Sequence, residues 1–275
     1  MLGTWPDGLR ALEEHGVRLV DSQGVERRFR VRATDDSQDC LRERNAIVLV
    51  KAWQTSRAAS QLVEFLTQDG LALTLQNGLG NREMLEDSLG EHRVAQGSTT
   101  TGATLENPGV VRPGGEGVVS LGEHPRIKPV GEMLEQAGFN IQYVSEVEAL
   151  IWGKLVINAA INPLTALLRV PNGELLQLKN ARHLMGELAQ EVVAVAAAKN
   201  IQLSFDDPIQ AAEEVAKRTE TNHSSMYQDI KRGALTEIDA ICGAVALEGE
   251  KLSVPTPVNK TMWHLIKAVV ARETG

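Results

Sequence analysis

Three side chains that can donate hydrogen bonds recur at a fixed spacing within one apolar stretch of the chain. Lys154, Asn158 and Asn162 lie four residues apart between Ile151 and Pro163, which places them on one face of a predicted helix. Because their neighbours are apolar, each of these groups would cost about 1–3 kcal/mol if buried without a partner. This stripe of Lys154, Asn158 and Asn162 therefore has two interpretations. Either it faces a cleft that binds a polar ligand, or the two amides bridge neighbouring helices while Lys154 extends to solvent.

The elements before this helix have the pattern of an α/β domain. Short apolar runs alternate with helical spacing up to about residue 145, which is typical of strands joined by crossover helices in a mostly parallel sheet. The run at 45–50 predicts a strand buried on both faces. Lys51 and Gln54 follow this strand, at the edge of the sheet where open α/β folds bind ligands. The other elements expected in this half are helices at 55–69, 81–89 and 129–138, strands at 71–75 and 141–144, and extended hairpins over 94–121.

The rest of the chain is expected to be all-helical. Strand signals end near residue 145, and long helical patterns follow. These predicted helices span 146–168, 181–199, 207–219, 236–247 and 257–272. We therefore expect two domains, a dinucleotide-binding domain over 1–145 and a helical domain over 146–275, which binds the substrate and serves in dimerisation.

Composition excludes several classes of function. The chain has 275 residues and a formal net charge of −8, which argues against nucleic acid as a partner because phosphate binding needs clustered Lys and Arg. Cys40 and Cys242 are the two cysteines, and their spacing predicts neither a disulfide framework nor a metal site. We find no apolar run of the ~20 residues that span a bilayer and no signal peptide. A cytoplasmic protein with a small-molecule ligand is the expectation.

Several motifs resemble the ketopantoate reductases, NADPH-dependent enzymes that reduce 2-dehydropantoate to pantoate. The long match runs from Trp152 to Ala166 and resumes at Pro171–Leu175. Shorter matches follow the same order along nearly the whole chain, at 49–54, 76–80, 97–103, 224–229 and 236–239. The resemblance implies a Rossmann-like N-terminal domain and a C-terminal domain similar to that of 6-phosphogluconate dehydrogenase. It further implies a 2-keto acid substrate, pantothenate and coenzyme A synthesis, and a homodimer.

The resemblance also implies roles for individual residues. Lys154 matches the general acid, an ammonium that can stabilise the charge developing on a ketone oxygen and deliver a proton. Burial would lower its pKa and the carboxylate of Glu237 would raise it, and the sequence leaves that balance open. Positions implied to bind substrate are Asn158, Asn162, Asn172, Ser225 and Asn77, and those implied to bind NADPH are Asn77, Ala103, Glu237, Lys51 and Gln54.

Some of these residues have ordinary structural explanations. Ser225 lies in a stretch that predicts a helix cap, Glu237 fits the first turn of a helix, and Lys51 fits a surface loop. The family match favours a functional role over a structural one for Ser225 and Glu237. As candidate site residues, Lys51 and Gln54 rank below Lys154.

The start of the chain departs from the family pattern. Dinucleotide-binding sheets open with a strand, a Gly-x-Gly-x-x-Gly turn and a helix, and Met1-Leu2-Gly3 instead resembles the end of the second strand. We interpret this as an N-terminally truncated domain that lacks roughly 25 residues of the ~30-residue unit. Thr4-Trp5 stands where the family usually has an arginine that binds the 2′-phosphate of NADPH, and Arg10 is the nearest candidate for that role. An inactive paralogue and a reductase of another 2-keto acid therefore stay open as alternatives.

Overall fold

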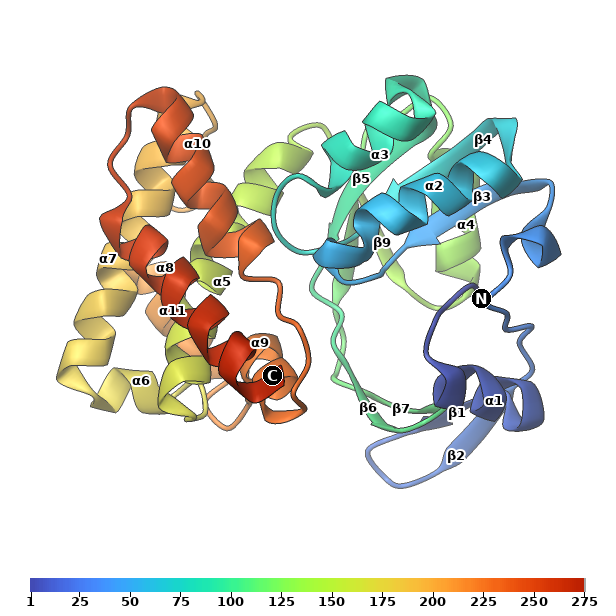
Figure 1. The fold of residues 1–275 in the computed structure, drawn as a ribbon, viewed down its shortest axis with the longest axis horizontal. Coiled ribbons are helices and arrows are strands. Elements are labelled where there is room, and N and C mark those ends of the chain that lie inside the picture. Colours follow the sequence, from blue (N-terminus) through green and yellow to red (C-terminus); the bar gives the residue numbers. More distant parts are fainter. Residues whose placement is uncertain (275) are drawn as a thin grey trace. The chain divides into compact units, whose positions relative to one another are not determined.

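The computed structural model describes residues 1–274 and divides the chain into two compact units (Figure 1). The first unit contains 1–48, 56–75 and 84–145, and the second contains 49–55, 76–83 and the chain from Glu146 onward. This division differs from the predicted domain of residues 1–145 in two short loops, 49–55 and 76–83, which group with the helices.

The first unit is built on a five-stranded, mostly parallel sheet. Its strands, in spatial order, are β3 (Glu43–Val48), β4 (Leu66–Thr74), β5 (Val94–Thr99), β8 (Val118–Gly122) and β9 (Asn140–Val144). The β5–β8 pair is antiparallel and the other neighbours are parallel. The helices that accompany this sheet in sequence are α1 (Pro6–His15), α2 (Thr55–Phe65), α3 (Asn81–Leu89) and α4 (Lys128–Gln136). The predicted Rossmann-like α/β architecture is thus confirmed.

The core of this unit lies around β4, β8 and α4. Leu71, Leu73 and Leu121 are almost fully buried and pack with Val130. The prediction that residues 45–50 are buried on both faces is wrong, because Val48 is the only buried residue of β3. This strand is the outermost of the sheet and pairs only with β4 among the described strands. Leu49, which follows β3, is 66% exposed.

A second sheet in the first unit has four short strands. Its spatial order is β2 (Glu26–Phe29), β1 (Val17–Val20), β7 (Val110–Pro113) and β6 (Ala103–Asn107). The expected hairpin is present between β6 and β7, where Gly109 adopts a φ of 71°. The sequence analysis missed β1 and β2. Every residue of β2 is exposed, so this strand carries no apolar pattern.

The second unit is helical over the residues described. Its helices are α5 (Val147–Leu168), α6 (Glu174–Gln177), α7 (Lys179–Ala198), α8 (Pro208–Arg218), α9 (Ser225–Lys231), α10 (Ala244–Leu252) and α11 (Pro257–Thr274). The helix predicted over 236–247 begins at Asp239 as a π-helical turn, η4 (Asp239–Gly243), and continues as α10. Of the seven-residue α9, the sequence analysis predicted the N-terminal cap and not the helix itself.

Helix α5 forms the centre of this unit and packs against α7, α8, α9 and α11. It has 22 residues and, by length and composition, is apolar enough to cross a membrane, although 72% of its most apolar window is buried inside the structure. The sequence analysis expected no apolar run of that length. Burial against four helices explains the hydropathy of α5 as that of a core helix.

Candidate functional site

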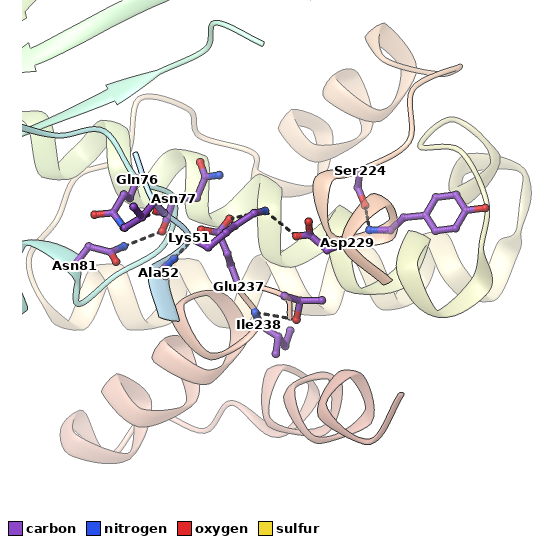
Figure 2. A network of polar contacts seen from close by, with 12 residues as sticks. Lys51, Ala52, Gln76, Asn77, Asn81, Ser224, Asp229, Glu237 and Ile238 are labelled. Carbon is purple, nitrogen blue, oxygen red and sulfur yellow. Dashed lines mark hydrogen bonds and ion pairs between the residues drawn. The ribbon is translucent and has the colours of Figure 1, made fainter. Parts of the chain in front are cut away.

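A cluster of charged side chains lies within the second unit (Figure 2). The Nζ atom of Lys51 lies 2.7 Å from Oδ2 of Asp229 and 3.7 Å from Oε2 of Glu237. The backbone N–H of Ala52 donates to Oε1 of Glu237 at 3.2 Å. Both carboxylates are buried, with 1% of Asp229 and 7% of Glu237 exposed. The loop after β3 is therefore anchored to α9 and to the segment before η4 by charge and by hydrogen bonding.

Lys154 belongs to the same electrostatic environment. It is partly buried in the middle of α5, and burial lowers the pKa of its ammonium group, while the charge of Glu237 raises that pKa by a smaller amount. The sequence analysis predicted both influences without their balance, and burial is the larger one. A lysine whose pKa is moved down towards neutrality is a better proton donor near physiological pH.

The N-terminus of α9 distinguishes two adjacent serines. Ser224 is the N-cap, and its Oγ accepts from the backbone N–H of Tyr227 at 3.1 Å. The hydroxyl of Thr165, on α5, lies 2.7 Å from the same Oγ. The cap predicted in this stretch is thus Ser224, whereas Ser225 is exposed at the first position of α9 and its hydroxyl is accessible to a ligand.

Three of the four asparagines predicted to bind substrate lie on α5 or just after it, and they differ in their surroundings. Asn158 is partly buried and Asn162 is 8% exposed, and both lie on α5 with Lys154. Asn172 follows α5, and its Nδ2 donates to the hydroxyl of Thr219 at 2.9 Å. Its Oδ1 is buried without a hydrogen-bond partner among the described residues. Asn172 therefore ties the turn after α5 to the end of α8.

The loop after β4 brings Asn77 into the second unit. Asn77 is half-buried, and the next residue, Gly78, has a φ of 81°. A Cβ at Gly78 would lie 2.4 Å from the carbonyl oxygen of Ala240, so only glycine fits this contact. The backbone N–H of Leu79 donates to the same oxygen at 2.9 Å.

Two remaining predicted residues are less closely tied to the cluster. Gln54 is partly buried in the short helix η2 (Ala52–Gln54), and its backbone N–H donates to the carbonyl of Lys51 at 2.8 Å. Ala103 begins β6 and is exposed in the first unit. The second unit thus contains Lys51, Gln54, Asn77, Lys154, Asn158, Asn162, Asn172, Ser225 and Glu237, and the first contains Ala103.

Sequence reasoning missed Asp229. Its carboxylate accepts from Lys51 and also from Nη2 of Arg232 at 2.6 Å. A signal was present, because an aspartate between Met226 and Ile230, both buried, must find partners. The distant partner, Lys51, carried no such signal.

The chemistry of the donor set fits a 2-keto acid and a reduced nicotinamide. The ammonium of Lys154, the amide of Asn158 and the hydroxyl of Ser225 are donors suited to a carboxylate and a ketone oxygen. Asn77, at the carboxyl end of β4, offers an amide at the position where open α/β sheets bind nucleotides. The set contains both classes of group that such a reaction needs, proton donors and polar anchors.

Comparisons with known proteins agree with this chemistry. The family model described as ketopantoate reductase PanE/ApbA matches residues 1–126, and the C-terminal model of the same family matches residues 146–270. A relative named 2-dehydropantoate 2-reductase from Archaeoglobus fulgidus is 37% identical over 266 residues, covering 95% of this chain and 86% of that protein. A relative of the same name from Halobacterium salinarum is 31% identical over 272 residues, a match that covers 97% of this chain and 89% of that protein.

Solved structures show the same likeness over the whole chain. A PanE/ApbA family ketopantoate reductase from Ralstonia eutropha has a TM-score of 0.92 at 27% identity, covering 98% of this chain and 90% of that one. A ternary structure of D-mandelate dehydrogenase with NADH and anilino(oxo)acetate has a TM-score of 0.93 at 26% identity, covering 100% and 91%. From its two family models and its relatives, this chain belongs to the ketopantoate reductase family.

Proposed function

We propose that this protein reduces 2-dehydropantoate to (R)-pantoate with NADPH, a reaction of pantothenate and coenzyme A synthesis. The observation that carries the proposal is Lys154, a partly buried lysine on a core helix, whose pKa burial lowers and the charge of Glu237 raises by a smaller amount. Relatives at 37% and 31% identity named 2-dehydropantoate 2-reductase support the substrate.

The chain's own residues stabilise charge and move a proton. When bound, the reduced nicotinamide supplies a hydride to the ketone carbon, and negative charge then develops on the ketone oxygen. The ammonium of Lys154 stabilises that charge and donates its proton to the oxygen, which becomes the product hydroxyl. The charge of Glu237 opposes the effect of burial on the pKa of Lys154 and so favours the protonated form.

The remaining residues bind and orient. Asn158, Asn162, Asn172 and Ser225 bind the carboxylate and hydroxyl of the substrate in this proposal, and Asn77 contributes to both ligands. Ala103, Glu237, Lys51 and Gln54 contact the cofactor. The exposure of Ser225 at the N-terminus of α9 favours such a role, whereas the bonds of Asn172 to Thr219 make its role partly structural.

Choice of cofactor is the finer part of the proposal. NADPH follows from the family resemblance, whereas the similar D-mandelate dehydrogenase was solved with NADH. Thr4 and Trp5, before α1, provide no cation for a 2′-phosphate. Both cofactors therefore belong in the assay. A cytoplasmic homodimer without nucleic-acid or membrane partners completes the proposal.

The test is the oxidation of NADPH and NADH, followed at saturating ketopantoate and across a panel of other 2-keto acids. The proposal expects the highest kcat/KM with ketopantoate and NADPH. A higher kcat/KM for another 2-keto acid overturns the substrate, and a higher kcat/KM with NADH overturns the cofactor. The Lys154→Met variant serves as the blank for background oxidation.

A further inference from the structure

Side-chain hydrogen bonds join the segments that follow β3 and β4, and Figure 2 shows the last of the series, between Asn81 and Asn77. The Nε2 of Gln76 donates to the carbonyl of Val50 at 2.7 Å and to the hydroxyl of Thr55 at 2.8 Å. That hydroxyl donates to Oδ1 of Asn81 at 2.8 Å. The Nδ2 of Asn81 then donates to the backbone carbonyl of Asn77 at 2.9 Å. We call Gln76, Thr55 and Asn81 the loop relay.

Two of the three residues in the loop relay are buried, Gln76 is half-buried, and the relay has a fixed direction. Thr55 is 0% exposed and Asn81 is 3% exposed, so water has little access to replace a missing partner. The Thr55 hydroxyl accepts one bond and donates one, and the Asn81 amide accepts through oxygen and donates through nitrogen. Each link therefore depends on the chemical identity of the next side chain.

The same two loops are also fastened to the helical part of the second unit. Ala52 binds Glu237 through its backbone N–H, and Leu79 binds Ala240 in the π-helical turn η4 in the same way. Helix turns of this kind often mark functional sites. Each loop is thus held at two places, by its backbone N–H bond to Glu237 or Ala240 and by the side chains of the loop relay. Lys51 and Asn77 lie between these two attachments in their loops.

We propose that Gln76, Thr55 and Asn81 are positioning residues that hold Asn77 in its cofactor-binding orientation. The inference rests on the proposed function, in which Asn77 contacts the cofactor. The relay acts on Asn77 through its backbone carbonyl, and it ties the position of that loop to the loop carrying Lys51. Loss of one link leaves the catalytic Lys154 in place and loosens the Asn77 loop.

The test compares Thr55→Val, which removes the hydroxyl at nearly constant volume, with Thr55→Ser, which keeps it. We expect Thr55→Val to raise the Kd of NADPH, measured by fluorescence titration, and its KM by about tenfold, as for one lost buried hydrogen bond. The kcat at saturating cofactor stays within about twofold of wild type, because Lys154 is undisturbed. Thr55→Ser restores wild-type binding.

A second pair separates positioning from general stability. Asn81→Asp keeps the acceptor for Thr55 and replaces the donor to Asn77 with a carboxylate oxygen, so it raises the Kd at least as much as Thr55→Val. Asn259→Asp is the matched control, since Asn259 is 0% exposed and donates to Glu191 and Leu188 in the helical core. This variant lowers the melting temperature and leaves the Kd unchanged.

Two results overturn the inference. One is wild-type affinity for NADPH in Thr55→Val and Asn81→Asp, and the other is an equal loss of affinity in Asn259→Asp. A wild-type protein that binds NADPH without reducing ketopantoate refutes the proposed function alone, because the relay is still measured through the Kd. A wild-type protein that binds neither NADPH nor NADH refutes both.

Discussion

The ammonium of Lys51 lies 2.7 Å from the carboxylate of Asp229, although 178 residues separate them in sequence. Asp229 is the more buried partner, with 2% of its side chain exposed against 33% for Lys51. It also accepts from Arg232 at 2.6 Å. One buried carboxylate thus pairs with two cations, and Lys51, which the family resemblance assigns to the cofactor, is held inside the helical unit.

Asp229→Asn should destabilise the protein, because it leaves Lys51 and Arg232 facing a neutral amide whose NH2 group repels them. We expect a loss of about 1–3 kcal/mol in the free energy of unfolding, measured by urea denaturation. Glu213→Gln is the control, since Glu213 pairs with Arg182 at 2.6 Å on the surface and such pairs contribute at most about 1 kcal/mol. Equal losses in the two variants would contradict this reading of Asp229.

Lys154→Met should abolish activity and stabilise the fold. Loss of a general acid typically costs a factor of about 10²–10⁴ in rate. The lowered pKa of Lys154 means that the folded state binds this proton less tightly than the unfolded state, so wild-type stability rises with pH from the folded pKa up to the ordinary value of about 10.4. Methionine does not titrate.

The stability difference therefore has a predicted pH dependence. Lys154→Met should melt at a higher temperature than wild type below the folded pKa of Lys154, and its advantage should shrink as the pH rises towards about 10.4. Thermal melts of both proteins over this range measure the effect. A difference that is independent of pH, or that grows with pH, would argue against a desolvated ammonium.

Much of the fold follows from apolar periodicity, because long buried helices have a strong pattern. The helix predicted at 146–168 is α5 at 147–168, and its polar stripe marks Lys154 before any comparison. The exposed β2 has no apolar face to detect. In η4 a locally helical sequence takes π geometry where the Gly78 loop contacts Ala240.

The site was only partly predictable, because sequence spacing reveals neighbours within one helix and not contacts between different elements. Spacing of three and four residues reveals side chains on one helix, so Lys154, Asn158 and Asn162 emerge together. The contact of Lys51 with Asp229 joins different elements and depends on tertiary packing. Likewise, nothing in the spacing of Thr55 and Asn81 indicates that a hydroxyl at the start of α2 meets an amide at the start of α3.

Glu237→Gln should move the pH dependence of catalysis. The charge of Glu237 raises the pKa of Lys154, so its removal lowers that pKa further. Because the protonated ammonium is the active form, kcat falls as pH rises through this pKa, and the basic limb of the kcat profile should shift to lower pH. Glu248→Gln is the control, since Glu248 pairs with Lys199 and Lys251 on the surface. If the basic limb of the kcat profile stays at the same pH, the charge of Glu237 does not influence the pKa of the proton donor.

Two glycines in the loop after β4 provide the last test, because they differ in what a side chain would meet. Gly78 and Gly80 have φ values of 81° and 87°, so alanine at either position costs about 1–2 kcal/mol in backbone strain. Only Gly78→Ala also places a Cβ against the carbonyl of Ala240, whereas the space at Gly80 is open. The loop must then move away from η4 and strain the Leu79 bond to Ala240.

We therefore expect Gly78→Ala to lose more stability than Gly80→Ala in urea denaturation and to raise the Kd of NADPH. The Kd of Gly80→Ala should stay close to that of wild type, because the Asn77 loop keeps its contact with η4. Equal Kd values in the two variants would mean that docking of this loop on Ala240 stabilises the fold without setting the position of Asn77. Weaker binding in Gly78→Ala alone would tie cofactor affinity to the backbone contact that this loop makes with η4 inside the second unit.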